Sequence, residues 1–87
     1  MKIVDGFIMR EVAGNNVVVA VGKKAKEFNG MINLNSAGAF LWKLLEKGKT
    51  EEELIGALET EYGIDREVAE RDAKAFIKKL CDAGIVK

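Results

Sequence analysis

The side chains that most often carry catalysis or bind metals are scarce in this chain of 87 residues. It contains no histidine and a single cysteine, Cys81. The commonest general base and metal ligand is therefore missing, and one cysteine cannot supply the roughly four Cys or His ligands of a structural zinc site. We expect no metal, no cofactor and no enzymatic activity, which leaves a binding module as the favoured class.

Three other features have both a structural and a functional interpretation. Ser36 follows Asn35 at a predicted helix start, where carrier proteins present a modified serine, but the acid that usually precedes it is missing and a helix cap is favoured. The triplet Glu51–Glu53 is a favourable charge pattern for a first helical turn and needs no catalytic role. Trp42 lies off the apolar stripe of its helix, which favours packing at the core edge, with a partner-facing aromatic as the alternative.

The lone cysteine also bears on location and on stability. No intrachain disulfide can form, which favours the cytoplasm, and no apolar stretch approaches the ~20 residues that span a bilayer. Cys81 follows Leu80 near a predicted helix end, so we expect a part-buried structural thiol. Its substitution should change stability only.

Before Leu34, apolar residues occur in short β-branched runs that predict three strands. The predicted strands are Phe7–Val12, Val17–Val21 and Met31–Leu34. The segments Gly14–Asn16 and Asn29–Gly30 are typical of tight turns. The stretch Lys23–Phe28 is ambiguous, being either a loop or the extension of a strand.

After Leu34 the apolar period becomes helical and predicts three helices. Their stripes are Ala37, Phe40, Leu41, Leu44 and Leu45; then Leu54, Ile55, Leu58 and Tyr62; then Ala69, Ala73, Phe76, Ile77 and Leu80. Asn35 or Ser36, Thr50 and Asp65 are the expected N-caps, and Thr50 with Glu53 forms a capping box. Ile85 and Val86 are expected to pack back on the core.

These elements predict one α+β domain over residues 1–87, with a small three-stranded antiparallel sheet followed by three helices in a winged-helix-like arrangement. Such folds often bind DNA with the last helix. Residues 65–82 carry five basic and five acidic side chains, however, and the acids gather toward the N-terminal end. Because phosphate neutralisation dominates affinity for DNA, nucleic-acid binding is the less favoured alternative.

Met31–Leu34 would be a short strand just before the helical half. In a three-stranded sheet two strands lie at the edges, and an edge strand has unpaired N–H and C=O groups to which an extended peptide can add. An edge blocked by the chain itself is the alternative.

An ordered series of segments resembles the PqqD-like proteins along nearly the whole chain. The segments are 28–35 (FNGMINLN), 38–45 (GAFLWKLL), 48–54 (GKTEEEL), 61–65 (EYGID), 72–80 (DAKAFIKKL) and 83–85 (AGI). The resemblance implies a winged-helix-like module that binds the leader segment of a ribosomally made precursor peptide and presents it to a modifying enzyme, often a radical SAM protein. In that family the leader lies as an added strand against the third strand, beside the last helix.

The resemblance implies a peptide-binding site on the third strand, at Met31, Ile32, Asn33 and Leu34, and on one row of the last helix. Two rows lie off the apolar stripe: Arg71, Lys74, Ala75 and Lys78, and beside it Val68, Asp72, Ala75 and Lys79. We expect the basic first row to border the peptide, since leaders in this family are often acidic. The expected partners are thus a precursor peptide and its modifying enzyme, with no nucleic acid and no membrane, and the chain is expected to be a monomer or weak dimer.

Overall fold

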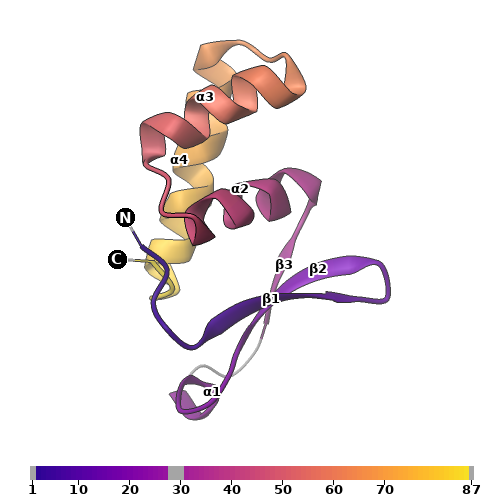
Figure 1. Cartoon of the computed structure of the whole chain (residues 1–87), viewed down its shortest axis with the longest axis vertical. Coiled ribbons are helices and arrows are strands. Elements are labelled where there is room, and N and C mark those ends of the chain that lie inside the picture. Colours follow the sequence, from indigo (N-terminus) through magenta and orange to yellow (C-terminus); the bar gives the residue numbers. More distant parts are fainter. Residues whose placement is uncertain (1, 28–30, 87) are drawn as a thin grey trace.

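The computed structural model describes residues 2–27 and 31–86. The predicted Asn29–Gly30 turn and Phe28 therefore lie outside the described residues. The elements are β1 (Phe7–Val12), β2 (Asn15–Ala20), α1 (Lys24–Glu27), β3 (Met31–Leu34), α2 (Ser36–Glu46), α3 (Glu51–Tyr62) and α4 (Arg66–Asp82) (Figure 1). The predicted α+β class is confirmed, and the arrangement is consistent with a winged-helix-like fold.

The three strands form an antiparallel sheet in the order β1-β2-β3. Val12 pairs with Asn15, so only Ala13 and Gly14 connect β1 to β2, and both have positive φ, at 52° and 82°. This is the backbone of a two-residue hairpin turn whose twist matches that of the strands. The turn therefore precedes the predicted Gly14–Asn16 segment by one residue, and Asn15 and Asn16 belong to β2.

Between β2 and β3 the structure corrects the sequence interpretation. The stretch from Lys23 onward neither stays a loop nor extends a strand: Lys24–Glu27 forms one helical turn, α1. Gly22, with φ of 62°, ends the extended backbone before it. Ala25 in α1 is exposed. The described side chains of this turn therefore form no buried apolar stripe, and the sequence had no helical periodicity there to detect.

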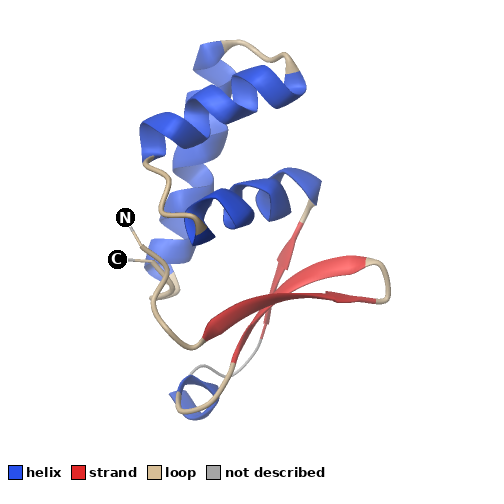
Figure 2. Ribbon diagram, in the orientation of Figure 1, coloured by secondary structure: helices blue, strands red, loops and turns tan. Residues whose placement is uncertain are grey.

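Helices α2, α3 and α4 pack together on one face of the sheet (Figure 2). The core joins Phe7, Val18 and Leu34 from the strands to the stripes of the three helices. Ile85 and Val86 are buried as predicted, and Val86 forms a bridge with Ile3 that brings the two ends of the described chain together. No helix of the described residues is long and apolar enough to cross a membrane.

Trp42 packs against the core as favoured, but it is fully buried and not at the core edge, because α2 lies between the sheet and the other helices and so buries a wider arc than its predicted stripe. The prediction for Cys81 is wrong. Cys81 is exposed and is not a part-buried thiol. Leu80 takes the core position instead, and the next residue of a helix is turned away by about 100°.

The N-terminus of α3 has the predicted capping box. The Thr50 hydroxyl accepts a hydrogen bond from Glu53 N–H at 3.2 Å, and the Glu53 carboxylate accepts one from Thr50 N–H at 3.0 Å. The bond from the Thr50 backbone lowers the pKa of Glu53. Asp65, by contrast, occupies the N-cap position of α4 without a side-chain bond to the helix.

Thr50→Ala is expected to lower the free energy of unfolding by about 0.5–2 kcal/mol, because one helix N–H loses its acceptor. Urea denaturation measures the difference. Thr60→Ala is the matched control, since Thr60 is exposed inside the same helix and alanine is the better helix former there. Equal losses in both variants would contradict a specific role for the cap.

Candidate functional site

The free edge of β3 is the first component of the site. Among the described residues β3 pairs only with β2, through Val19–Met31, Val18–Ile32, Val17–Asn33 and Asn16–Leu34. Along its other edge no strand of the described residues 2–27 and 31–86 lies beside it. Ile32 and Leu34 face the core, whereas Met31 and Asn33 face the opposite side of the sheet and are exposed. Backbone N–H and C=O groups along this edge are thus open to an added strand.

A surface hollow of about 540 Å³ adjoins the end of β3. It lies among β3, α2, α3 and α4. It is lined by Asn33, Leu34, Asn35, Ala37, Gly38, Leu41, Leu58, Tyr62, Ile64, Asp72, Ala75, Phe76 and Lys79. Most of these side chains are apolar, with charges only at Asp72 and Lys79. Such a lining suits apolar side chains of an extended ligand, with polar groups at the border that fix its position.

The turn from β3 into α2 keeps the edge and the hollow together. The Asn35 side chain accepts a hydrogen bond from Gly38 N–H at 2.8 Å, so Asn35, and not Ser36, caps α2. A Cβ on Gly38 would lie 3.3 Å from both Asn35 Oδ1 and Leu34 Cβ, tighter than ordinary contact. Glycine therefore allows the first turn of α2 to pack closely against the last residue of β3.

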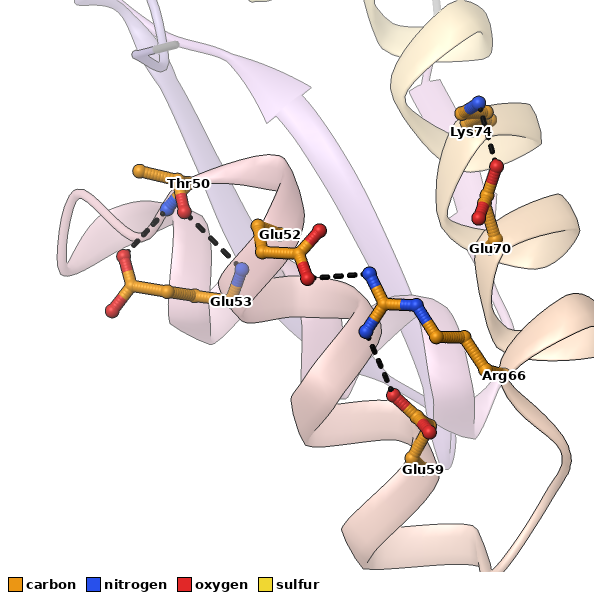
Figure 3. Close-up of polar contacts among 7 residues, drawn as sticks. All are labelled: Thr50, Glu52, Glu53, Glu59, Arg66, Glu70 and Lys74. Atoms are coloured by element: carbon orange, nitrogen blue, oxygen red, sulfur yellow. Dashed lines mark hydrogen bonds and ion pairs between the residues drawn. The ribbon is translucent and has the colours of Figure 1, made fainter.

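Two contacts hold α3 at the far side of the hollow. The ring of Tyr62 packs edge-on against Phe40 of α2, with centroids 5.8 Å apart. Arg66, the first residue of α4, bridges Glu52 and Glu59 of α3 (Figure 3). These contacts link α3 to both neighbouring helices, and the exposed ion pairs among them are individually weak.

The two rows of α4 are placed differently with respect to the hollow. Asp72, Ala75 and Lys79 of the second row line it. Ala75 also belongs to the basic row, but Arg71, Lys74 and Lys78 are not among the lining residues. The structure thus brings Asn33, Leu34 and Ala75 of the predicted site to the hollow and leaves the three basic residues outside it.

The basic side chains outside the hollow have acidic partners. Lys74 Nζ lies 2.9 Å from Glu70 Oε1, and Lys78 Nζ lies 2.9 Å from Asp82 Oδ2. Hydrogen bonds to these carboxylates raise the pKa of both lysines. Lys79, in contrast, has no ion pair with any residue in the described part of the chain.

Sequence reasoning missed the residues that line the hollow from α3 and its C-terminal end. Leu58 and Tyr62 were assigned to a core stripe, yet Tyr62 is 44% exposed. Ile64, half-buried after the helix end, carried no periodic signal. The one available clue was the aromatic residue at the end of an otherwise aliphatic stripe.

Comparisons with known proteins give a consistent picture. The family model described as "Coenzyme PQQ synthesis protein D (PqqD)" matches residues 10–86. No curated protein matches the chain. The solved structure "TbiB1 in Complex with the TbiA(beta) Leader Peptide" is 29% identical, with a TM-score of 0.83 over 100% of this chain and 95% of that one. "Lasso peptide synthetase B1 complexed with the leader peptide" is 21% identical, with a TM-score of 0.79 over 99% and 95% of the two chains, and shares the fold.

Proposed function

The chain belongs to the PqqD family, and from this premise we propose that it recognises the leader segment of a ribosomally synthesised precursor peptide by strand addition and presents it to a modifying enzyme. One observation carries the proposal: the free edge of β3 lies beside an apolar hollow. The similar TbiB1 structure holds a leader peptide, which supports the same ligand class here.

In this proposal the backbone and the side chains of the leader have separate roles. Hydrogen bonds to the edge at Met31–Leu34 supply sequence-independent affinity. Alternate leader side chains point toward the hollow, where Tyr62, Ile64 and Phe76 offer apolar contact and so select the sequence. The chain itself performs no chemistry in this scheme. The modifying enzyme, for which we propose a radical SAM protein, acts elsewhere on the same precursor, and we place both in the cytoplasm.

A DNA-binding role receives less support from the charges of α4. Arg66, Arg71, Lys74 and Lys78 all lie within ion-pair distance of acidic side chains. A basic side chain adds affinity for DNA when it displaces a counterion from a phosphate. A side chain that already has an acidic partner does this poorly, so it adds little affinity.

The direct test is a titration of the isotopically labelled chain with synthetic leader segments of precursor peptides from the same genome, followed by NMR. We expect saturable shifts concentrated at Met31–Leu34 and at the residues that line the hollow. Binding should vary little with salt compared with DNA binding. Shifts confined to β1, or salt-sensitive binding to duplex DNA without leader binding, would overturn the proposal.

The prediction that the basic row of α4 borders the leader stays a prediction, and paired charge reversals test it against the second row. Lys79→Glu is expected to weaken the binding of an acidic leader about two- to fivefold, because Lys79 lines the hollow without an ion pair. Lys78→Glu is the matched control at the adjacent position and should change affinity less. A larger effect from Lys78→Glu, or from Lys74→Glu, in calorimetric titrations would favour the basic row.

A further inference from the structure

The wall that α4 gives to the hollow carries opposite charges at its two ends. Among the residues that line the hollow, the charged ones are Asp72 and Lys79, both exposed side chains of α4. They are seven residues apart, which in a helix is about two turns, or about 10.5 Å along the axis, on nearly the same face. Ala75 and Phe76 line the hollow between them. The wall is therefore acidic at one end, apolar in the middle and basic at the other end.

Both charges are available to a ligand. Lys79 has no ion pair within residues 2–27 and 31–86. The Asp72 carboxylate lies 3.6 Å from Nε of its neighbour Arg71, and both of these side chains are more than half exposed. An exposed ion pair of this kind is weak, and Arg71 does not line the hollow. A ligand in the hollow thus meets a negative charge at Asp72 and a positive charge at Lys79.

The arrangement of β3 and α4 relates these charges to the direction of an added strand. Figure 1 shows that β3 and α4 run in opposite directions along the long axis of the molecule. Both ladders of the sheet are antiparallel, and antiparallel pairing is the more stable kind. A leader that pairs with β3 in this way runs in the same direction as α4. Its N-terminal part therefore passes Asp72, and its C-terminal part passes Lys79.

The spacing of the charges suits alternate residues of a strand. Every second side chain of an added strand faces the helices, and the first and third of these are about 13 Å apart. That distance is close to the separation of Asp72 and Lys79 once the length of the lysine side chain is added. The second of these side chains then faces Ala75 and Phe76. Three alternate leader positions thus match the acidic, apolar and basic parts of the wall.

We infer that Asp72 and Lys79 set the direction and the register of the leader by charge, an inference that rests on the proposed leader recognition. The preferred segment carries a basic, an apolar and an acidic residue at alternate positions, in that order from its N-terminus. The reverse order brings like charges together at both ends of the hollow, which is unfavourable. Main-chain hydrogen bonds are the same in every register, whereas a shift of two residues breaks both charge contacts.

The test compares two synthetic peptides of identical composition. Both derive from a leader segment, taken from a precursor peptide of the same genome, that binds the wild-type chain. An alanine scan of this segment identifies the apolar residue that contributes most to affinity. The Lys-first peptide has Lys two residues before this position and Glu two residues after it, and the Glu-first peptide has the two exchanged. Calorimetric titration is expected to show that the wild-type chain binds the Lys-first peptide about tenfold more tightly, since two exposed charge contacts become favourable.

A charge-swapped chain shows whether the two residues cause this preference. The double variant Asp72→Lys with Lys79→Asp is expected to bind the Glu-first peptide more tightly. Its melting temperature should change little, because both positions are exposed. The matched control, Lys43→Glu with Glu46→Lys, also exchanges one charge of each sign, at exposed positions of α2 outside the hollow. This control should keep the wild-type preference.

The other outcomes contradict separate parts of the scheme. Equal affinities of the two peptides for the wild-type chain, or a preference that stays the same in the charge-swapped chain, would overturn the inference while leader recognition stands. A wild-type preference for the Glu-first peptide that inverts in the charge-swapped chain would show a leader parallel to β3, against the direction inferred. Absence of binding by every leader segment would refute the proposed function itself.

Discussion

Of two proline variants in β3, Ile32→Pro and Asn33→Pro, one is expected to lose stability and the other to remain folded and lose leader affinity. Successive N–H groups of a strand point to opposite edges, so one of the two faces β2 and the other faces the free edge. Proline removes the N–H and places its ring in the path of an added strand. The lost bond is worth about 0.5–1.5 kcal/mol, and the obstruction makes the total effect on affinity about tenfold or more.

Side-chain effects need their own controls, because Ile32 packs against the core and Asn33 is exposed. Ile32→Ala and Asn33→Ala report the loss of each side chain alone. Arg10→Pro and Glu11→Pro apply the same pair of changes to β1, the other edge strand. The better-folded variant of the β1 pair should keep its leader affinity, as measured by titration with the synthetic leader.

Leader affinity that survives in both β3 variants while they remain folded would show that the leader does not add to this strand. Loss of affinity in a well-folded β1 variant would instead move the added strand to the opposite edge. Circular dichroism melts identify which variants are folded and so decide which comparison is valid.

The edge strand itself was predictable from sequence because its signals are local. Met31–Leu34 is extended as predicted, and Asn35 follows at once as the cap of α2. A change of apolar period from two to 3.6 at Leu34 fixes where the sheet ends and the helices begin. The free edge depends only on the order of three short strands, which consecutive antiparallel pairing makes the simplest arrangement.

The hollow was not predictable in the same way, because it depends on how helices rotate and diverge in three dimensions. The rows of α4 that contain Lys78 and Lys79 differ by one residue, about 100° of rotation, and periodicity could not decide which one turns toward β3. Tyr62 shares a helical stripe with Leu58 but lies at the end of α3, where the stripe leaves the core and reaches the surface. Which row of α4 faces β3 and where the α3 stripe reaches the surface both depend on tertiary packing, and neither is visible as a pattern in the sequence.

Trp42 shows where the periodicity argument predicts too little burial, since its helix buries more than one stripe. Its substitution also has the largest expected effect on stability. Trp42→Ala should lower the free energy of unfolding by about 3–5 kcal/mol, because a fully buried aromatic side chain is replaced by a cavity. That is a large part of the roughly 5–15 kcal/mol that stabilises a typical domain. Urea denaturation monitored by circular dichroism measures the loss.

Trp42→Phe separates packing from any recognition role. The phenyl ring keeps most of the apolar contact and removes the indole Nε1–H, which has no acceptor among the described residues. An unsatisfied buried donor costs about 1–3 kcal/mol, so its removal should offset part of the lost volume and keep Trp42→Phe well above Trp42→Ala in stability. Leader and enzyme affinities should then match the wild-type chain. Reduced binding of either partner by a fully folded Trp42→Phe would restore the partner-facing interpretation of this residue. A loss of less than about 1 kcal/mol in the free energy of unfolding of Trp42→Ala would contradict the place of Trp42 in the core.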